Sequence, residues 1–175
     1  MKHIILIGFK NAGKTVIGKR LAERLGRKFV DLDARVEKRE GMTARDIVVK
    51  EGEIYFRNKE VETLREIIGN KESIVLALGG GAVIAKENQE LLTGHTVILV
   101  SAPKEVLFER SMKKGRPAFF PKGLSDREAF EKLYTERDSV YEKLATVKVE
   151  NDGTVGEAVE IILNSHLIKG GDRLR

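Results

Sequence analysis

The sequence has no cysteine among its 175 residues. This excludes a disulfide framework, a thiolate metal site and a cysteine nucleophile. Long apolar runs are scarce as well, and the run nearest the N-terminus, residues 4–7, ends at Gly8. Such a run is far shorter than the apolar region of a signal peptide or a membrane span. We therefore expect a cytoplasmic protein with no membrane partner.

A block of one charge sign is also missing. The formal net charge is +5, but Lys and Arg are interleaved with Asp and Glu along the whole chain. This distribution suits small anionic ligands and does not predict a nucleic-acid partner. The hydrophobic and charged fractions, 41% and 34%, are typical of a folded globular protein. We find no internal repeat or linker, and therefore expect one domain over residues 1–168, followed by a flexible tail at 169–175. We expect the protein to be a monomer.

Short apolar or β-branched runs alternate with longer segments whose apolar residues recur at helical spacing. One apolar stripe begins at Val16 and ends at Gly26, a typical helix terminator. Alternating strands and helices predict an α/β fold, with a parallel sheet covered by helices on both faces. The predicted strands are residues 4–7, 28–32, 73–78, 96–100 and 146–149, and further helical stripes run through residues 61–68, 106–110 and 130–134.

A phosphate-binding loop follows the first predicted strand, where residues 8–15 read GFKNAGKT. Gly8 allows a sharp turn, and Gly13 allows the backbone to approach a ligand where a Cβ would collide. The amides that open the following helix attract an anion. Lys14, which we expect at an open site, adds a charge for the outer phosphates, and the Thr15 hydroxyl is suited to bind Mg²⁺. A chance glycine-rich turn is the alternative interpretation.

Two common classes of P-loop protein do not match the rest of the chain. A GTPase would carry the guanine-binding motif Asn-Lys-x-Asp. This motif is missing, since the nearest stretches, 58–61 and 70–73, lack the aspartate. The apolar run 74–78 continues into glycines 79–81 where many ATPases carry an acidic residue for the metal. The metal carboxylate must therefore come from elsewhere.

Asp31 and Asp33, in the stretch VDLD, form the one tight acidic pair at the end of a predicted strand. Residues two apart on an extended backbone point to the same side. One carboxylate could hold Mg²⁺ through water while the other accepts a proton from an attacking hydroxyl. The alternative is a strand end followed by an aspartate that caps a helix.

Six motifs in order resemble the shikimate kinase family, from Lys2 to about Leu163. They are the P-loop, the DLD pair, GEIYFRNKE at 52–60, GGG at 79–81, RP at 116–117 and ERDSVY at 136–141. The resemblance implies transfer of the ATP γ-phosphoryl to the 3-hydroxyl of shikimate, on the way to chorismate and the aromatic amino acids. It also implies a P-loop NTPase-type three-layer fold, whose five-stranded parallel sheet has the order 2-3-1-4-5.

The resemblance also assigns roles to positions of this sequence. It implies a substrate-binding region at about 33–61 and a lid at about 112–124. The implied catalytic residues are Asp33 as the base, Lys14 and Arg116. The implied substrate contacts are Asp33, Arg57, Gly79, Gly80, Gly81 and Arg137, and the implied Mg²⁺ ligands are Thr15 and Asp31. For Arg57 the alternative is a cation on a helix surface, paired with Glu60 or Glu53. The implied nucleotide contacts are Gly8, Asn11, Ala12, Gly13, Lys14, Thr15, Val16, Arg110 and Arg116.

The predicted lid has its own sequence signal. It holds Gly115 and Gly123, two prolines and several cations, with no helical or strand period. A loop of this composition is expected at the surface, because burial would leave its backbone groups unpaired. Phe119 and Phe120 are unusual at an exposed tip, so we expect them to pack down in one state. An ordinary connecting loop is the alternative.

Several residues depart from the family pattern. Val16 follows Thr15 where a second hydroxyl residue is usual, and Asn11 replaces a common glycine. Ala44 and Val48 occupy positions that usually carry a larger aliphatic residue and a phenylalanine. These two substitutions predict a roomier substrate pocket. Ala118, Phe119 and Phe120 stand where the lid usually carries leucines, which predicts a different docking of the lid.

Two other functions stay open at this point. A kinase of another small hydroxy acid, such as gluconate, would share the P-loop and the fold, but not the arginine pair together with GGG. A nucleotide-binding regulator without turnover is the other, and the presence of Lys14, Asp31, Asp33 and Arg116 argues against it.

Overall fold

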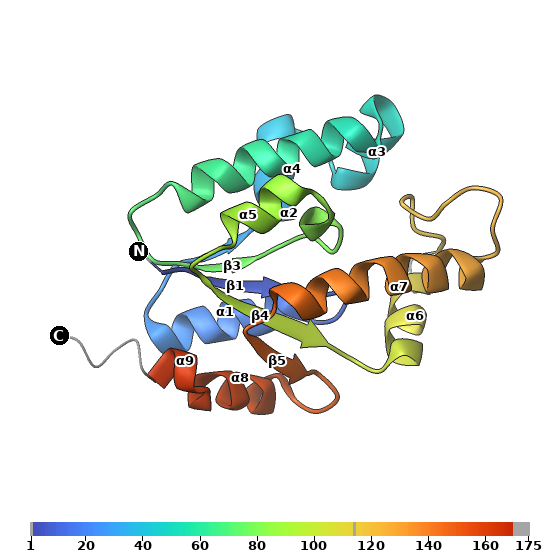
Figure 1. Ribbon diagram of the computed structural model, residues 1–175. Helices are drawn as coiled ribbons and strands as arrows, with labels where there is room; N and C mark the ends of the chain where they lie inside the picture. The colour runs from blue at the N-terminus through green and yellow to red at the C-terminus, as the bar shows by residue number, and fades with distance from the viewer. Residues whose placement is uncertain (1, 114, 170–175) are drawn as a thin grey trace.

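The computed structural model describes residues 2–113 and 115–169. Its centre is a five-stranded, all-parallel sheet in the order β2-β3-β1-β4-β5, which confirms the predicted fold class (Figure 1). The run of aliphatic residues in β1 is buried along its whole length, as expected for a central strand covered on both faces. The strands are β1 (Ile4–Ile7), β2 (Phe29–Asp31), β3 (Val75–Ala77), β4 (Thr96–Ser101) and β5 (Val147–Glu150).

Helices flank this sheet on both sides, with α1 and α8 on one side and α4 and α5 on the other (Figure 1). The strand arrowheads point to the end of the molecule where α3 and the loop between α6 and α7 lie. The helices are α1 (Lys14–Leu25), α2 (Leu32–Glu40), α3 (Ala44–Glu51), α4 (Glu53–Ile68), the short 3₁₀ turn η1 (Ala82–Ile84), α5 (Lys86–Leu91), α6 (Lys104–Met112), α7 (Asp126–Leu144), α8 (Val155–Asn164) and α9 (His166–Lys169).

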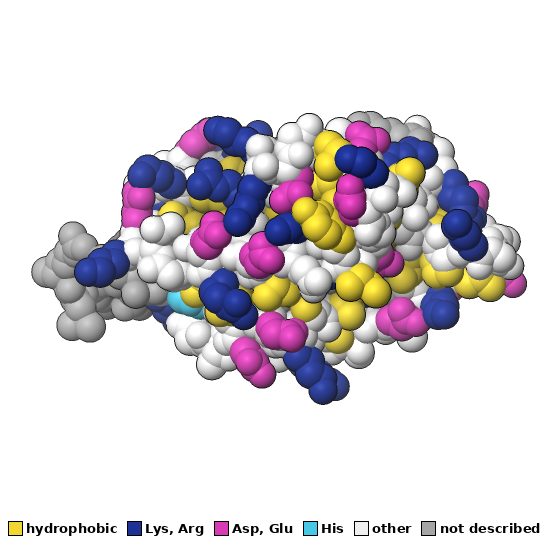
Figure 2. All heavy atoms as spheres, turned by 90° about the horizontal axis from the view of Figure 1, so that it is seen from above, with side chains coloured by type: hydrophobic (Ala, Val, Ile, Leu, Met, Phe, Trp, Pro, Cys, Tyr) yellow, Lys and Arg dark blue, Asp and Glu magenta, His cyan; other side chains and the backbone are white. Residues whose placement is uncertain are grey.

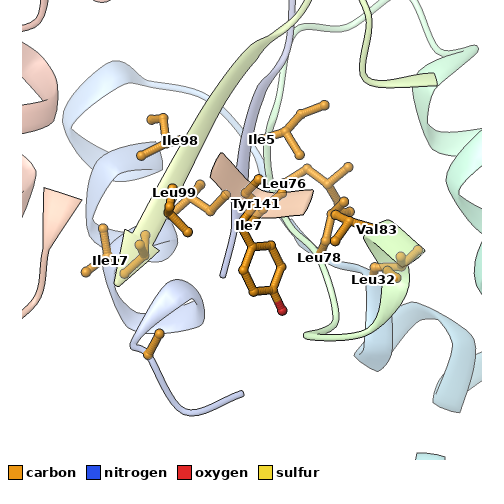
Figure 3. Close-up of a cluster of buried hydrophobic side chains, with 14 of the residues drawn as sticks. Ile5, Ile7, Ile17, Leu32, Leu76, Leu78, Val83, Ile98, Leu99 and Tyr141 are labelled. Atoms are coloured by element: carbon orange, nitrogen blue, oxygen red, sulfur yellow. The ribbon is translucent and has the colours of Figure 1, made fainter. Parts of the chain in front are cut away.

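The core lies between the sheet and its helices, and aliphatic side chains from β1, β3 and β4 fill it (Figure 3). Tyr141 of α7 packs against this cluster with its side chain buried. Its hydroxyl donates a hydrogen bond to the carbonyl of Gly80, in the loop after β3. Because the hydroxyl has this partner, the ring can be buried without an unpaired polar atom. The contact fixes α7 against the glycine loop at the carboxyl end of the sheet.

All five predicted strands are confirmed, with boundaries that shift by one or two residues. The stripe from Val16 to Gly26 is confirmed as α1, and Gly26 ends it with a left-handed φ of 61°. The prediction missed α2, α3, α5, α8 and α9. The start of α8 could have been predicted from the sequence, because Thr154 and Glu157 form a capping box there. Lys169, predicted to lie in the tail, ends α9, and residues 170–175 lie outside the described residues.

Charges of both signs are mixed on the surface, as the interleaved sequence predicts. On the face in Figure 2, Lys and Arg side chains stand among Asp and Glu side chains. In residues 2–113 and 115–169, no helix combines the length and the low polarity that crossing a bilayer requires.

Candidate active site

The P-loop leaves β1 at the carboxyl end of the sheet and enters α1. Gly8 has a φ of 139° and Gly13 a φ of 107°, both in the region that favours glycine. A Cβ at Gly8 would collide with the carbonyl of Val100, and one at Gly13 with the amide of Asn151. The Asn151 amide donates to the Ala12 carbonyl at 2.8 Å. Both glycines are therefore required by the loop's conformation.

Lys14 is folded back into this loop. Its Nζ donates to the carbonyls of Gly8 and Phe9, each at 2.9 Å, and the residue is only 8% exposed. Burial lowers the pKa of Lys14 to about 8, although Asp33 and Asp31 act in the opposite direction. The expectation that Lys14 stands at an open site is wrong, because the loop wraps around its ammonium group.

Asp31 lies beside the P-loop hydroxyl. Thr15 Oγ1 donates to Asp31 Oδ2 at 2.8 Å, and Asp31 Oδ1 accepts from the Ala34 amide and caps α2. The capping alternative raised above is therefore correct for Asp31. Oxygen donors of this kind are those that Mg²⁺ prefers, usually together with phosphate oxygens. Among the described residues, no group of three or more His, Cys, Asp or Glu side chains could hold a metal ion by itself.

Asp33 reaches the site from a helix. The expected extended geometry for the acidic pair is wrong, because Asp31 ends β2 and Asp33 lies in the first turn of α2. Asp33 Oδ1 is buried without a hydrogen-bond partner in the structure. Burial raises the pKa of Asp33, and the nearby Asp31 carboxylate raises it further. An unpaired buried carboxylate at a cavity wall is suited to accept a ligand hydroxyl.

Arg57 lies on α4 between two acidic residues. It donates to Glu60 Oε2 at 2.6 Å and to Glu53 Oε1 at 3.0 Å. Glu60 is buried, and its Oε1 has no hydrogen-bond partner among the residues that the structure describes. Burial raises the pKa of Glu60 to about 7, although Arg57 opposes this rise. Arg57 is therefore both ion-paired within its helix and part of the cavity wall.

Arg137 of α7 is also buried, at 5% exposure. Its guanidinium carbon lies 5.6 Å from the ring centre of Phe9 and 5.3 Å from that of Phe119. Burial lowers the pKa of Arg137, and Arg57 acts in the same direction. Two like-charged arginines at one cavity suit an anionic ligand.

The three glycines after β3 allow charged side chains to approach the backbone. A Cβ at Gly79 would collide with carboxylate oxygens of Asp33 and Glu60, and one at Gly81 with the guanidinium of Arg57. A Cβ at Gly80 would press on the backbone of Lys10. These glycines thus leave room for the charged groups themselves as well as for a ligand.

A cavity of about 530 Å³ brings most of the predicted residues together. The P-loop residues Gly8, Ala12, Gly13, Lys14, Thr15 and Val16, together with Asp31, do not line it. Val16 is 57% exposed, in the first turn of α1. The predicted residues that do line the cavity are Asn11, Asp33, Arg57, Gly79, Gly80, Gly81, Arg110, Arg116 and Arg137.

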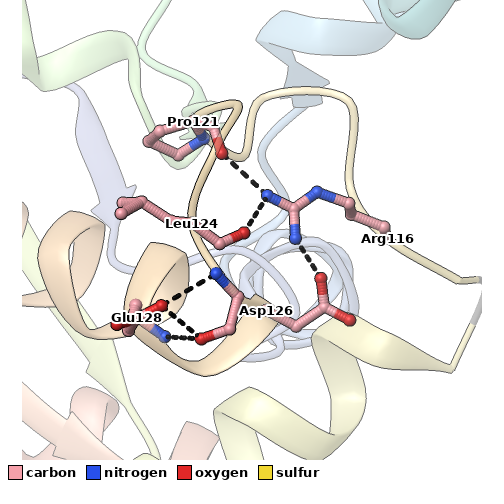
Figure 4. A network of polar contacts seen from close by, with 6 residues as sticks. Arg116, Pro121, Leu124, Asp126 and Glu128 are labelled. Carbon is pink, nitrogen blue, oxygen red and sulfur yellow. Dashed lines mark hydrogen bonds and ion pairs between the residues drawn. The ribbon is translucent and has the colours of Figure 1, made fainter.

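Arg110 and Arg116 make protein contacts. Arg110 donates to the Asn11 carbonyl at 3.4 Å, and the Asn11 side chain donates back to the Arg110 carbonyl. Arg116 forms an ion pair with Asp126 and donates to the carbonyls of Pro121 and Leu124 (Figure 4). In this conformation Arg116 is therefore bound to its own loop.

Sequence reasoning missed several residues of the cavity. Lys10 follows the first turn of the P-loop and was assigned no role. Glu60 was expected only as a possible ion-pair partner of Arg57, three residues earlier on a helix, and the structure shows that pair as well as the burial of Glu60 at the cavity. Nothing in the sequence marks Ser111, whose buried hydroxyl has no hydrogen-bond partner among the described residues. Ala44 and Val48 do line the cavity, as the resemblance implies.

A family model described as shikimate kinase matches residues 10–166. This chain belongs to the shikimate kinase family. The match spans every residue assigned above to the shikimate kinase site except Gly8.

Curated shikimate kinases and solved structures extend this result over the whole chain. A shikimate kinase from Pelotomaculum thermopropionicum is 41% identical over 97% of this chain and 96% of its own. The structure of a shikimate kinase from Acinetobacter baumannii in complex with shikimate is 34% identical, with a TM-score of 0.86 over 100% of this chain and 96% of that one. A shikimate kinase from Aquifex aeolicus is also 34% identical, with a TM-score of 0.81 over 98% of both chains.

Proposed function

We propose that this member of the shikimate kinase family transfers the γ-phosphoryl of ATP to the 3-hydroxyl of shikimate. One observation carries the proposal: a single cavity beside the P-loop joins two arginines, the half-buried Arg57 and the buried Arg137, to the carboxylate of Asp33, whose Oδ1 is buried. The arginines suit a carboxylate, because a guanidinium offers planar, two-pronged donors. Asp33 suits a ring hydroxyl, because its Oδ1 has no hydrogen-bond partner in residues 2–113 and 115–169.

In the proposed reaction a substrate hydroxyl oxygen attacks the γ-phosphorus. The bond from phosphorus to the bridging oxygen breaks, ADP leaves, and the hydroxyl proton passes to the Asp33 carboxylate. Lys14 and the opening amides of α1 offset the negative charge on the phosphates. The positive charge of Arg116 would join them after Arg116 leaves Asp126. Thr15 and Asp31 would hold Mg²⁺, which neutralises phosphate charge when bound.

We further propose that the protein is a monomer that acts in the cytoplasm. One copy of the chain supplies every group named in this mechanism, which supports a monomer. The cytoplasm is where its phosphoryl donor is made. Residues 33–61 act as the substrate-binding region and 112–124 as the lid.

An assay of ADP release tests the function directly. Purified protein with ATP and Mg²⁺ is given shikimate, gluconate and a small panel of other hydroxy acids. We expect release with shikimate at the highest kcat/KM of the panel. Faster turnover of gluconate would identify a kinase of a different hydroxy acid, and a folded, ATP-binding protein without turnover would identify a regulator.

A further inference from the structure

Phe119, in the loop between α6 and α7, contacts two cations that line the cavity. The Nζ of Lys10, in the P-loop, lies 5.0 Å from the centre of its ring. The guanidinium carbon of Arg137, on α7, lies 5.3 Å from the same centre. Phe119 lines the cavity and packs against the hydrophobic core, so its ring is partly buried. One residue of the predicted lid therefore connects the P-loop with Arg137. Together with Arg57, Arg137 forms the proposed carboxylate clamp, the pair of arginines expected to bind the substrate carboxylate.

Arg137 is a buried cation beside two aromatic rings. Within residues 2–113 and 115–169 no carboxylate forms an ion pair with it, in contrast to Arg57, which has two. A buried cation without a counter-ion is costly unless other groups stabilise it. Phe9 and Phe119 both lie within cation–π distance of its guanidinium, and this attraction is strongest where water is excluded.

We propose that Phe119 is a positioning residue for the substrate carboxylate: its ring holds the Arg137 guanidinium against Phe9, with the N–H donors free for the ligand. This inference rests on the proposed function, because it takes the carboxylate of shikimate as the ligand of Arg137. An aromatic ring offers no conventional hydrogen-bond acceptor, so a cation–π contact leaves the N–H donors of the guanidinium available for a ligand.

We expect Phe119 to raise the affinity for shikimate by ordering the Arg137 side chain before the ligand binds. An arginine side chain has many rotamers, and fixing it when the ligand arrives lowers affinity. With Phe119 in place, part of this ordering is complete before shikimate binds. A role confined to lid closure would affect ATP and turnover instead, because the lid closes over the phosphates. Affinity for shikimate in the absence of nucleotide therefore separates the two roles.

The test measures shikimate binding to the nucleotide-free protein by calorimetry. We compare the wild type with Phe119→Leu, which removes the aromatic face, and Phe119→Tyr, which keeps it. We expect Phe119→Leu to raise Kd about 3- to 10-fold, equivalent to about 0.7–1.4 kcal/mol, and Phe119→Tyr to stay within about 2-fold of the wild type. Thermal unfolding of each variant checks that the fold is intact.

A second comparison distinguishes positioning from simple packing. Phe119→Leu is repeated in an Arg137→Met background, where no cation remains for the ring to position. We expect the Kd ratio between Phe and Leu at position 119 to fall toward 1 in that background. The same ratio in both backgrounds, or an unchanged Kd in a folded Phe119→Leu, would overturn the inference. If the wild type itself does not bind shikimate but binds another acid, the proposed function fails instead, and that acid replaces shikimate in the same comparison.

Discussion

Arg57 and Glu60 form an ion pair one turn apart on α4, with Arg57 Nη1 2.6 Å from Glu60 Oε2. The Glu60 side chain is only 1% exposed, while that of Arg57 is 23% exposed toward the cavity side. The pair therefore places an ionisable carboxyl group beside an arginine of the proposed clamp, in the wall of the same cavity.

The pH dependence of stability should report on Glu60. Burial raises its pKa from 4.5 to about 7, so the folded protein binds this proton more tightly than the unfolded chain does. The stabilisation is complete below about pH 4.5 and is lost as the pH rises through about 7. We expect the free energy of unfolding of the wild type to fall relative to Glu60→Gln by about 2–3 kcal/mol between pH 5 and 8. Urea unfolding at four pH values measures this, and parallel curves for the two proteins would contradict it.

Lys14→Met should abolish most turnover without unfolding the protein. The change removes the charge proposed to lie nearest the transferring phosphoryl group, and also two hydrogen bonds to P-loop carbonyls. It also removes a buried cation whose pKa is lowered to about 8, which partly offsets the lost bonds. We expect kcat to fall by at least about 10²-fold. Normal ADP production by the folded variant would refute the role of Lys14.

Asp33→Asn tests the acid–base step. Asparagine keeps the size of the side chain but cannot take the proton, so we expect kcat to fall by about 10²- to 10⁴-fold, with a smaller change in the KM for shikimate. Because burial raises the pKa of Asp33, wild-type activity should also fall on acidification at a higher pH than an ordinary aspartate would give. A large rise in KM with unchanged kcat would show that Asp33 only positions the ring.

The carboxylate clamp can be tested on the substrate and on the protein. Methyl shikimate lacks the charge, so we expect a kcat/KM well below that of the acid. Arg57→Lys and Arg137→Lys should each weaken shikimate binding, since lysine loses the two-pronged match, and charge-assisted hydrogen bonds contribute about 1.5–3 kcal/mol each. Equal turnover of the acid and the ester would exclude the clamp.

The sequence predicted much of this site because its signals are local. The P-loop spacing, the apolar strands and the position of Gly26 each depend on a few adjacent residues, and each prediction holds. The geometry of Asp31 and Asp33 was predicted wrongly because the strand ends one residue earlier than its pattern indicates. A helix that starts at Leu32 then turns Asp33 toward the cavity.

Contacts between distant segments could not be predicted. Arg137 meets Phe9 and Phe119 only after α7 packs across the P-loop, and no spacing in the sequence encodes that contact. The same holds for the pairing of Tyr141 with Gly80. The resemblance supplied the roles of Arg57 and Arg137, but the aromatic partners of Arg137 emerged only from the fold.

Arg116 of the predicted lid is held by Asp126 and by two carbonyls of its own loop (Figure 4). To reach the phosphates, Arg116 must leave these partners, so Asp126 competes with the nucleotide for the guanidinium. We expect Arg116→Ala to lower kcat about 10²- to 10³-fold while weakening ATP binding less, because the contact would form only in the closed state. Asp126→Asn should act in the opposite direction and lower the KM for ATP, since a neutral partner releases Arg116 more easily.

Limited proteolysis follows the same motion without mutation. Lys113 and Lys122 are exposed, so trypsin should cut after both in the free protein, whereas the Arg116–Pro117 bond resists trypsin. Closure over ATP and shikimate together should slow cleavage at both positions, and each ligand alone should protect less. The Asp126→Asn variant serves as the matched control, because it should reach the protected state at a lower ATP concentration than the wild type. Unchanged cleavage with both ligands saturating would show that residues 112–124 form an ordinary connecting loop.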